Sequence, residues 1–287
     1  YLRAHPLGAQ AARHALEPLI NLARLHIRGG QGRRAADLVD ALYTAVSTRV
    51  DATVDGVEIP AHLTDSQEAH QQVRRWLWAV LLATGSRALA AAGLWQEACQ
   101  RLGDYRGIGH RMLDGRQIAV IAHIVSRDSG GARVLLDDTE PGEPWENAVT
   151  ACLTLHCRRG SPDDADPGFL LDKYHVLDIS ASSLAVFHTR LGLSFIDALG
   201  AVGNPHARRI ATGLIGSPAA SRDGYVARDL LDHSGCRGLL TTAQVQELND
   251  LVDACALNRG TLPAALLDDL TTALTSAEKT IARIVSR

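Results

Sequence analysis

Apolar residues recur every three to four positions through most of the chain, which is the spacing of amphipathic helices. The first clear stripe runs from Glu17 to about Ile27, and Gly29 and Gly30 end it. The same spacing predicts an all-α fold. Its further helices cover about 33–48, 67–92, 94–102, 111–127, 132–137, 145–157, 182–199, 205–214, 222–233, 242–258 and 262–287.

One short segment departs from this helical pattern. Residues 53–54 and 57–59 are β-prone, and they flank Asp55-Gly56. This dipeptide suits a type I′ turn, whose two central residues both need positive φ. We therefore expect one small β-hairpin near 53–59, with the next helix capped by Asp65 and Glu68. A later pair, Gly130-Gly131, is expected to form a turn.

The composition supports a helical, globular chain. Of 287 residues, 46% are hydrophobic and only 4% aromatic, and alanine and leucine, which favour helices, are abundant. The length suggests one or two domains. Lys173 and Lys279 are the only lysines, a skew typical of GC-rich genomes such as those of actinobacteria.

Charge, cysteines and hydropathy restrict the setting. The net charge of -3 argues against direct nucleic-acid contact by this span. The sequence contains no apolar run of ~18 residues, so no membrane span is expected. Five cysteines without compact spacing suggest free thiols in a reducing cytoplasm. The first residue is Tyr1, so the chain is expected to be part of a longer one.

A short pattern recurs along the first half of the chain. Residues 22–30 read Leu-Ala-x-x-His-x-x-x-Gly and are followed by Ala35, whereas residues 85–93 read Gly-Ser-x-x-Leu-x-x-x-Gly and are followed by Ala98. A third, weaker copy is in phase at Ala132, 34 residues after Ala98, with Arg127 where glycine is expected. Small residues at these positions let two helices pack closely.

This pattern resembles the tetratricopeptide repeat. The resemblance implies stacked antiparallel helical hairpins in a right-handed superhelix. It covers about residues 15–145 and predicts a repeat domain at 1–158. An acidic loop or linker is expected at 159–168, and further helical hairpins at 169–287, packed on the array or continuing it. A fourth, weaker copy centres on 205–207.

Such arrays form a concave groove lined by the first helix of each hairpin. The register of the repeats gives groove positions with polar side chains that suit a peptide carboxylate or acidic groups. A solvated helix face with local ion pairs is the alternative interpretation. The candidate ligand-binding residues are Asn21, Arg24, Arg28, Arg87, Gln117 and His123.

Two other clusters contain residue types that can carry chemistry. Cys152, His156 and Cys157 lack the four convergent ligands of structural zinc, so core packing is favoured and no metal is expected. The cluster of His175, Asp178 and His188 offers acid–base groups. Chance clustering among 12 histidines is the favoured explanation.

No cofactor is expected, because 107–109 and 200–203 carry glycines without the lysine of a phosphate-binding loop. Three functions therefore stay open. The first is a non-catalytic repeat protein that binds a peptide, protein or small-molecule signal, for example as the sensor region of a transcriptional regulator. The second is an all-α enzyme or accessory subunit of specialised, natural-product metabolism, using His123, His156, His175 or His188. The third is a scaffold for protein assembly, for example as a homodimer.

Overall fold

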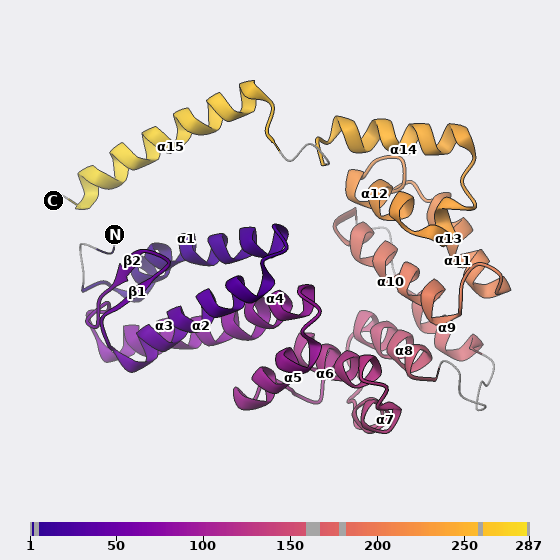
Figure 1. The fold of residues 1–287 in the computed structure, drawn as a ribbon, viewed down its shortest axis with the longest axis horizontal. Helices are drawn as coiled ribbons and strands as arrows, with labels where there is room; N and C mark the ends of the chain where they lie inside the picture. Colours follow the sequence, from indigo (N-terminus) through magenta and orange to yellow (C-terminus); the bar gives the residue numbers. More distant parts are fainter. Residues whose placement is uncertain (1, 3–5, 159–166, 178–181, 258–260, 286–287) are drawn as a thin grey trace. The chain divides into compact units, whose positions relative to one another are not determined.

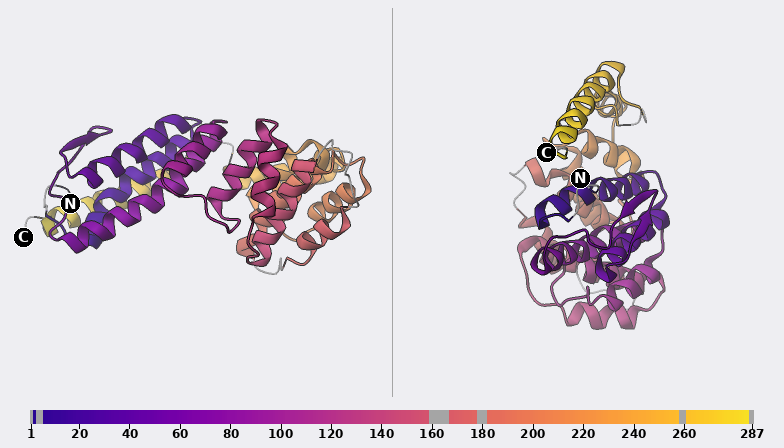
Figure 2. Two further views of the ribbon diagram at one scale, coloured as in Figure 1. Left: turned by 90° about the horizontal axis from the view of Figure 1, so that it is seen from below. Right: turned by 90° about the vertical axis from the view of Figure 1, so that its left-hand side faces the viewer.

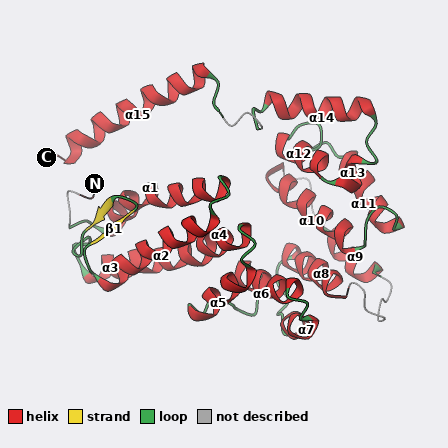
Figure 3. Ribbon diagram, in the orientation of Figure 1, coloured by secondary structure: helices red, strands yellow, loops and turns green. Residues whose placement is uncertain are grey.

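The computed structural model describes residues 2, 6–158, 167–177, 182–257 and 261–285. The expected all-α fold is confirmed, and the one pair of strands in the described ranges is the small hairpin (Figure 3). The chain divides into two compact units. Unit 1 comprises residues 1–126 and 271–287, and unit 2 comprises residues 127–270.

Three long helices form the body of unit 1 (Figures 1 and 2). Helices α1 (Ala9–Arg28) and α2 (Gly32–Thr48) form an antiparallel hairpin. Helices α3 (Gln67–Val80) and α4 (Ser86–Ala91) are joined by a π-helical turn, Leu81–Gly85, into one continuous helix that packs on α2. Helices α5 (Trp95–Asp104) and α6 (Asp114–Val125) follow them in the unit.

The core of unit 1 lies between these helices. Leu16, Ile20, Leu42, Leu77 and Leu89 are almost completely buried there. Each such side chain stabilises the fold by roughly 1.5–3 kcal/mol. Burial on α2 thus fixes which of its sides faces the core and leaves the opposite side to carry polar residues.

The β-hairpin follows α2 as expected. Strand β1 (Ala52–Val54) pairs antiparallel with β2 (Val57–Ile59), with Val54 opposite Val57. Asp55 and Gly56 have φ of 48° and 81°, as a type I′ turn requires. Val54 and Ile59 are buried, so the hairpin is held by packing against the core.

The recurring pattern has a common backbone geometry. Gly30 and Gly93, which each join two packed helices, have φ of 73° and 74°. Arg127, at the third position of the pattern, also has positive φ, 61°. Each is followed five residues later by an alanine with no exposed surface: Ala35, Ala98 and Ala132.

Unit 2 consists of helices and their connections in the described part of the chain. They are α7 (Ser129–Asp137), α8 (Pro144–Arg158), α9 (Gly168–His175), a 3₁₀ turn (Ser182–Leu184), α10 (Ala185–Ala198), α11 (Pro205–Ile215), α12 (Gly224–Asp232), α13 (Ser234–Arg237) and α14 (Thr242–Ala254). Helix α10 contacts α8, α11 and α12, and α14 packs on α12. Phe195 and Ile196 of α10 and Leu230 of α12 are fully buried in this core.

The last helix, α15 (Ala264–Val285), is drawn in yellow in Figure 1. All of its described side chains are exposed. None of the described helices is apolar over a length sufficient to cross a bilayer.

Several local predictions were wrong. Helix α1 begins at Ala9, not Glu17, and it passes through Pro18. Ser66, not Asp65, caps α3 by accepting a hydrogen bond from the amide of Ala69. Gly130 and Gly131 lie in the first turn of α7, because Asp128 caps the helix before them.

Two further differences concern unit 2. Helix α9 has no counterpart among the predicted helices, because its 8 residues give too short a stripe. The units divide between Ser126 and Arg127, whereas the sequence placed a linker at 159–168. Of that segment, 159–166 lie outside the described residues.

Candidate binding groove along helix α2

Two neighbouring grooves lie in unit 1 and share one residue of α2, Asp40. The first, called here the polar groove, has a volume of about 580 Å³. The second, called the hairpin groove, has a volume of about 400 Å³. The polar groove is lined by Asp40, Gln96, Glu97, Gln100, Arg101, Asp104 and Tyr105. The hairpin groove is lined by Asp37, Asp40, Ala41, Thr44, Ala45, Thr48, Val50, Ala52, Thr53 and Val54.

The periodicity of α5 explains why one of its sides is polar. Ala98 and Leu102 are buried against the core of unit 1. The residues around them at helical spacing, Gln96, Gln100 and Asp104, are exposed. Because residues four apart share a helix face, these three side chains form one row along the groove.

Tyr105 and Asp40 connect the end of α5 to α2. The Tyr105 hydroxyl donates a hydrogen bond to Asp40 Oδ1 over 3.3 Å. The backbone oxygen of Tyr105 accepts a bond from Trp78 Nε1 over 3.2 Å, and its ring meets Tyr43 edge to face at 5.6 Å. Burial, followed by the nearby Asp40 carboxylate, raises the pKa of Tyr105. The tyrosine is therefore held as a neutral donor at one wall of the groove.

The charged groups of the polar groove leave an excess of negative charge. Arg33 on α2 forms a two-bond ion pair with Glu97, and its hydrogen bond lowers the pKa of that carboxyl. The Arg101 guanidinium donates to the backbone oxygen of Ala36 over 3.3 Å. Asp40 and Asp104 add two carboxylates, so the lining residues together with Arg33 hold three acids and two bases, a net charge of −1.

The hairpin groove is less polar. Ala41 and Val50 contribute exposed apolar surface, and Thr44 and Thr48 contribute methyl and hydroxyl groups. Arg34 forms an ion pair with Asp55 over 3.1 Å, which ties α2 to the hairpin turn. The side of α2 that faces away from the core is therefore apolar at the hairpin and acidic at α5.

The six residues predicted from the repeat lie elsewhere, and neither groove is lined by any of them. Arg24 donates to Asn21 over 2.8 Å on the exposed side of α1, and Arg28 is exposed in the last turn of that helix. Arg87 on α4 pairs with Asp114 at 3.4 Å. Gln117 on α6 donates to the Met112 backbone over 2.9 Å, and His123 is half-buried near the end of α6.

The sequence did not predict these grooves, because the resemblance to the repeat placed the binding groove on the first helix of each hairpin. The grooves lie instead along α2 and α5, the second helices. A signal was present: Gln96, Gln100 and Asp104 repeat at four-residue spacing, and Asp37 and Asp40 stand on one face of α2.

In unit 2 the predicted histidines surround Tyr174. The His188 ring stacks on Tyr174 at 4.6 Å, and the Tyr174 hydroxyl lies 3.4 Å from His188 Nδ1. His175 meets Tyr174 edge to face at 5.7 Å. Tyr174 is 4% exposed, and burial raises its pKa and lowers that of His188. Asp178, the third member of the predicted cluster, lies outside the described residues.

The cysteine-rich end of α8 does not converge on one point. Burial raises the pKa of Cys152 to about 12. His156 Nε2 lies 3.0 Å from the backbone oxygen of Ser194, and the Cys157 thiol lies 3.5 Å from that of Ser129. Within the described ranges, no group of three or more His, Cys, Asp or Glu side chains is arranged to hold a metal ion.

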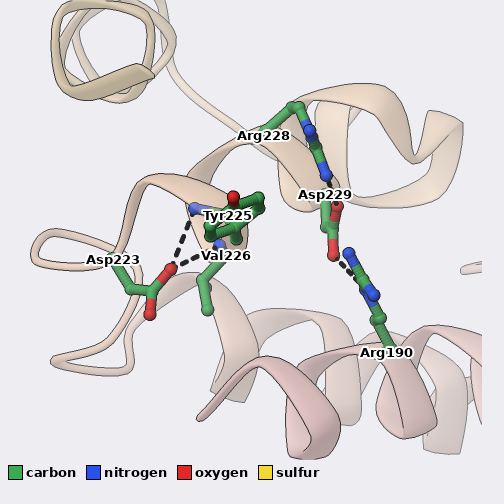
Figure 4. A network of polar contacts seen from close by, with 6 residues as sticks. All are labelled: Arg190, Asp223, Tyr225, Val226, Arg228 and Asp229. Carbon is green, nitrogen blue, oxygen red and sulfur yellow. Dashed lines mark hydrogen bonds and ion pairs between the residues drawn. The ribbon is translucent and has the colours of Figure 1, made fainter. Parts of the chain in front are cut away.

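A second polar network joins α10 to α12 (Figure 4). The Asp229 side chain is 13% exposed. Its carboxylate accepts hydrogen bonds from Arg190 over 2.6 Å and from Arg228 over 3.4 Å. The Arg228 guanidinium also lies 5.2 Å from the centre of the Tyr225 ring, and Asp223 caps α12. The carboxylate is engaged by two guanidinium groups, so this network holds the two helices together.

Comparison with known proteins adds no relative: the chain matches no protein-family model, no curated protein and no solved structure.

Proposed function

We propose that unit 1 is a non-catalytic binding module that holds an extended, positively charged protein segment along α2. The observation that carries this proposal is the sharing of Asp40 by two grooves of different character. An apolar side chain of the segment would occupy the hairpin groove. A lysine or arginine a few residues away would reach Asp40 and Asp104.

The form of the grooves supports a peptide more than a small molecule. Small-molecule sites enclose most of their ligand. Here Thr44, Thr48, Gln100 and Asp104 are all exposed, so the two grooves are open to solvent along their length. A chain lying across the surface can contact both grooves at once and gain from each.

The charge of the polar groove selects the class of ligand. Arg33 pairs with Glu97, and Arg101 bonds to the backbone of α2, so both cations already have partners. The remaining carboxylates favour a cationic group, and a guanidinium would form the stronger, two-pronged contact. Because the groove is open, salt should weaken this attraction.

The histidine cluster of unit 2 supports packing more than catalysis. His188 is half-buried against the ring of Tyr174, and Gly192 leaves room for the tyrosine hydroxyl. A binding role for the chain, such as that of a sensor region in a regulator, therefore has more support than the enzyme alternative.

Selection from a random peptide library displayed on phage tests the proposal. Selected peptides should carry a basic residue near an apolar one, and synthetic copies should bind in fluorescence anisotropy. The Asp40→Asn/Asp104→Asn double variant should bind at least tenfold more weakly, as expected for loss of two charge-assisted contacts. Glu68→Gln, an exposed acid on α3 outside the grooves, is the matched control. Failure to enrich any peptide, or equal binding by the double variant, would overturn the proposal.

A further inference from the structure

Helix α15 carries an exposed apolar seam with coiled-coil spacing. Leu267, Leu270, Leu274, Ala277 and Ile281 follow one another at intervals of three and four residues. Leu270 is 46% exposed, Leu274 61% and Ile281 36%. Together with the exposed Leu266 and Leu267, these three make five large exposed apolar residues on α15. The other large exposed apolar residues of the described chain are spread over many elements. A seam of this kind is typical of a helix that pairs with another.

We propose that α15 pairs with α15 of a second copy of this chain, in antiparallel orientation. The charges along the helix carry this choice. The first turns hold Asp268 and Asp269, and the last turns hold Lys279 and Arg283 beside one acid, Glu278, so the two ends of the helix carry net charges of opposite sign. An antiparallel pair places the acidic end of each helix beside the basic end of the other, whereas a parallel pair places like charges level with one another.

The side-chain sizes fit the same arrangement. In an antiparallel pair centred between Thr275 and Ser276, Leu274 lies level with Ala277 of the second copy, so each large residue meets a small one. Leu270 then lies level with Ile281. A parallel pair would instead set Ala277 against itself and leave a gap in the seam.

The positions beside the seam raise no obstacle. Thr271, Ala273 and Thr280 flank it and are uncharged, and Glu278 is the one described flanking charge. The helix has 22 residues and is therefore about 33 Å long. Since so short a seam binds weakly, we expect dimerisation to depend on concentration.

Sedimentation velocity of the full chain tests the pairing between about 1 µM and about 100 µM. The parent chain should shift from monomer to dimer over this range. Leu270→Glu/Leu274→Glu should remain monomeric, whereas Thr272→Glu/Ser276→Glu, which adds the same charge on the opposite side of α15, should dimerise. A parent chain that stays monomeric would overturn the proposal and assign the seam to another part of its own chain or to a different partner. A dimer that survives the leucine changes would also overturn it.

Cysteine cross-linking tests the orientation, in a background in which the exposed Cys255 is replaced by serine. A mixture of Leu274→Cys and Ala277→Cys chains should form a disulfide-linked dimer faster than either chain alone. Faster linkage of Leu274→Cys with itself would indicate a parallel pair and overturn the assignment.

Discussion

The Tyr105 hydroxyl donates to Asp40 Oδ1 over 3.3 Å, and this contact ties the end of α5 to α2 at the point where the two grooves meet. Asp40 is thus held in place before any ligand arrives. The tyrosine takes up one oxygen of the carboxylate, which leaves the second oxygen for a cation in the proposed site.

Removing this hydrogen bond should destabilise unit 1 and change the titration of the tyrosine. Tyr105→Phe should lower the free energy of unfolding by roughly 0.5–1.5 kcal/mol. Because the pKa of Tyr105 is raised in the folded state, its contribution is complete below the ordinary tyrosine pKa and is lost as pH rises through the folded one. Asp40→Asn should bring the pKa closer to the ordinary value, as measured by phenolate absorbance. An unchanged titration would show that burial alone is responsible.

The proline within α1 leads to a second prediction. Pro18 cannot donate a backbone hydrogen bond to His14, so Pro18→Ala should stabilise the protein by roughly 1–3 kcal/mol in urea unfolding. Pro205→Ala is the matched control, since Pro205 is the first residue of α11, where no donor is needed, and it should change stability little. Equal effects of the two changes would contradict this explanation.

The same proline shows what a sequence pattern can predict. The apolar stripe placed the beginning of α1 near Glu17, and Pro18 is of a residue type that favours the first turn of a helix. The structure continues the helix back to Ala9 because Leu16 and Ala12 are buried on the same side as Leu19. Burying one leucine provides about as much free energy as the proline costs, roughly 2–3 kcal/mol, and only tertiary packing decides between them.

The predictable parts of the fold have local causes. The hairpin was predictable because Asp55-Gly56 determines its turn, and most helices because their apolar stripes are long. The grooves were not predictable, because they depend on how α2, α5 and the hairpin pack together. The repeat register put the candidate site on Arg24 and Arg87, on the first helix of each hairpin, whereas Asp40 and Asp104 lie on the second.

The third turn of the recurring pattern yields another test. Arg127 adopts the left-handed conformation that Gly93 adopts 34 residues earlier. This conformation costs a residue with a side chain roughly 1 kcal/mol more than it costs glycine, so Arg127→Gly should stabilise the protein by about that amount. Arg133→Gly, the same change on the exposed side of α7, should destabilise it by about 1 kcal/mol. Changes of the same sign in chemical unfolding would exclude the conformational cause.

Acid should destabilise both units through histidines that are held neutral. Burial, followed by the nearby His175, lowers the pKa of His188 in unit 2, and burial with Arg49 and Arg74 lowers that of His70 in unit 1. Below about pH 6.5, these two histidines therefore bind protons more readily in the unfolded chain than in the folded one. The stability that neutral histidines provide is complete above that pH and is lost as pH falls through the folded pKa values.

Urea midpoints followed by circular dichroism at about pH 7.5 and about pH 5.5 measure this loss. The parent chain should have the lower midpoint in acid. His188→Phe keeps a ring against Tyr174 but cannot titrate, so it should reduce the difference between the two midpoints. Adding His70→Gln should reduce the difference further, and His14→Phe, on the exposed side of α1, should leave it unchanged. A difference that persists in full in the His188→Phe/His70→Gln chain would assign the acid sensitivity to other groups.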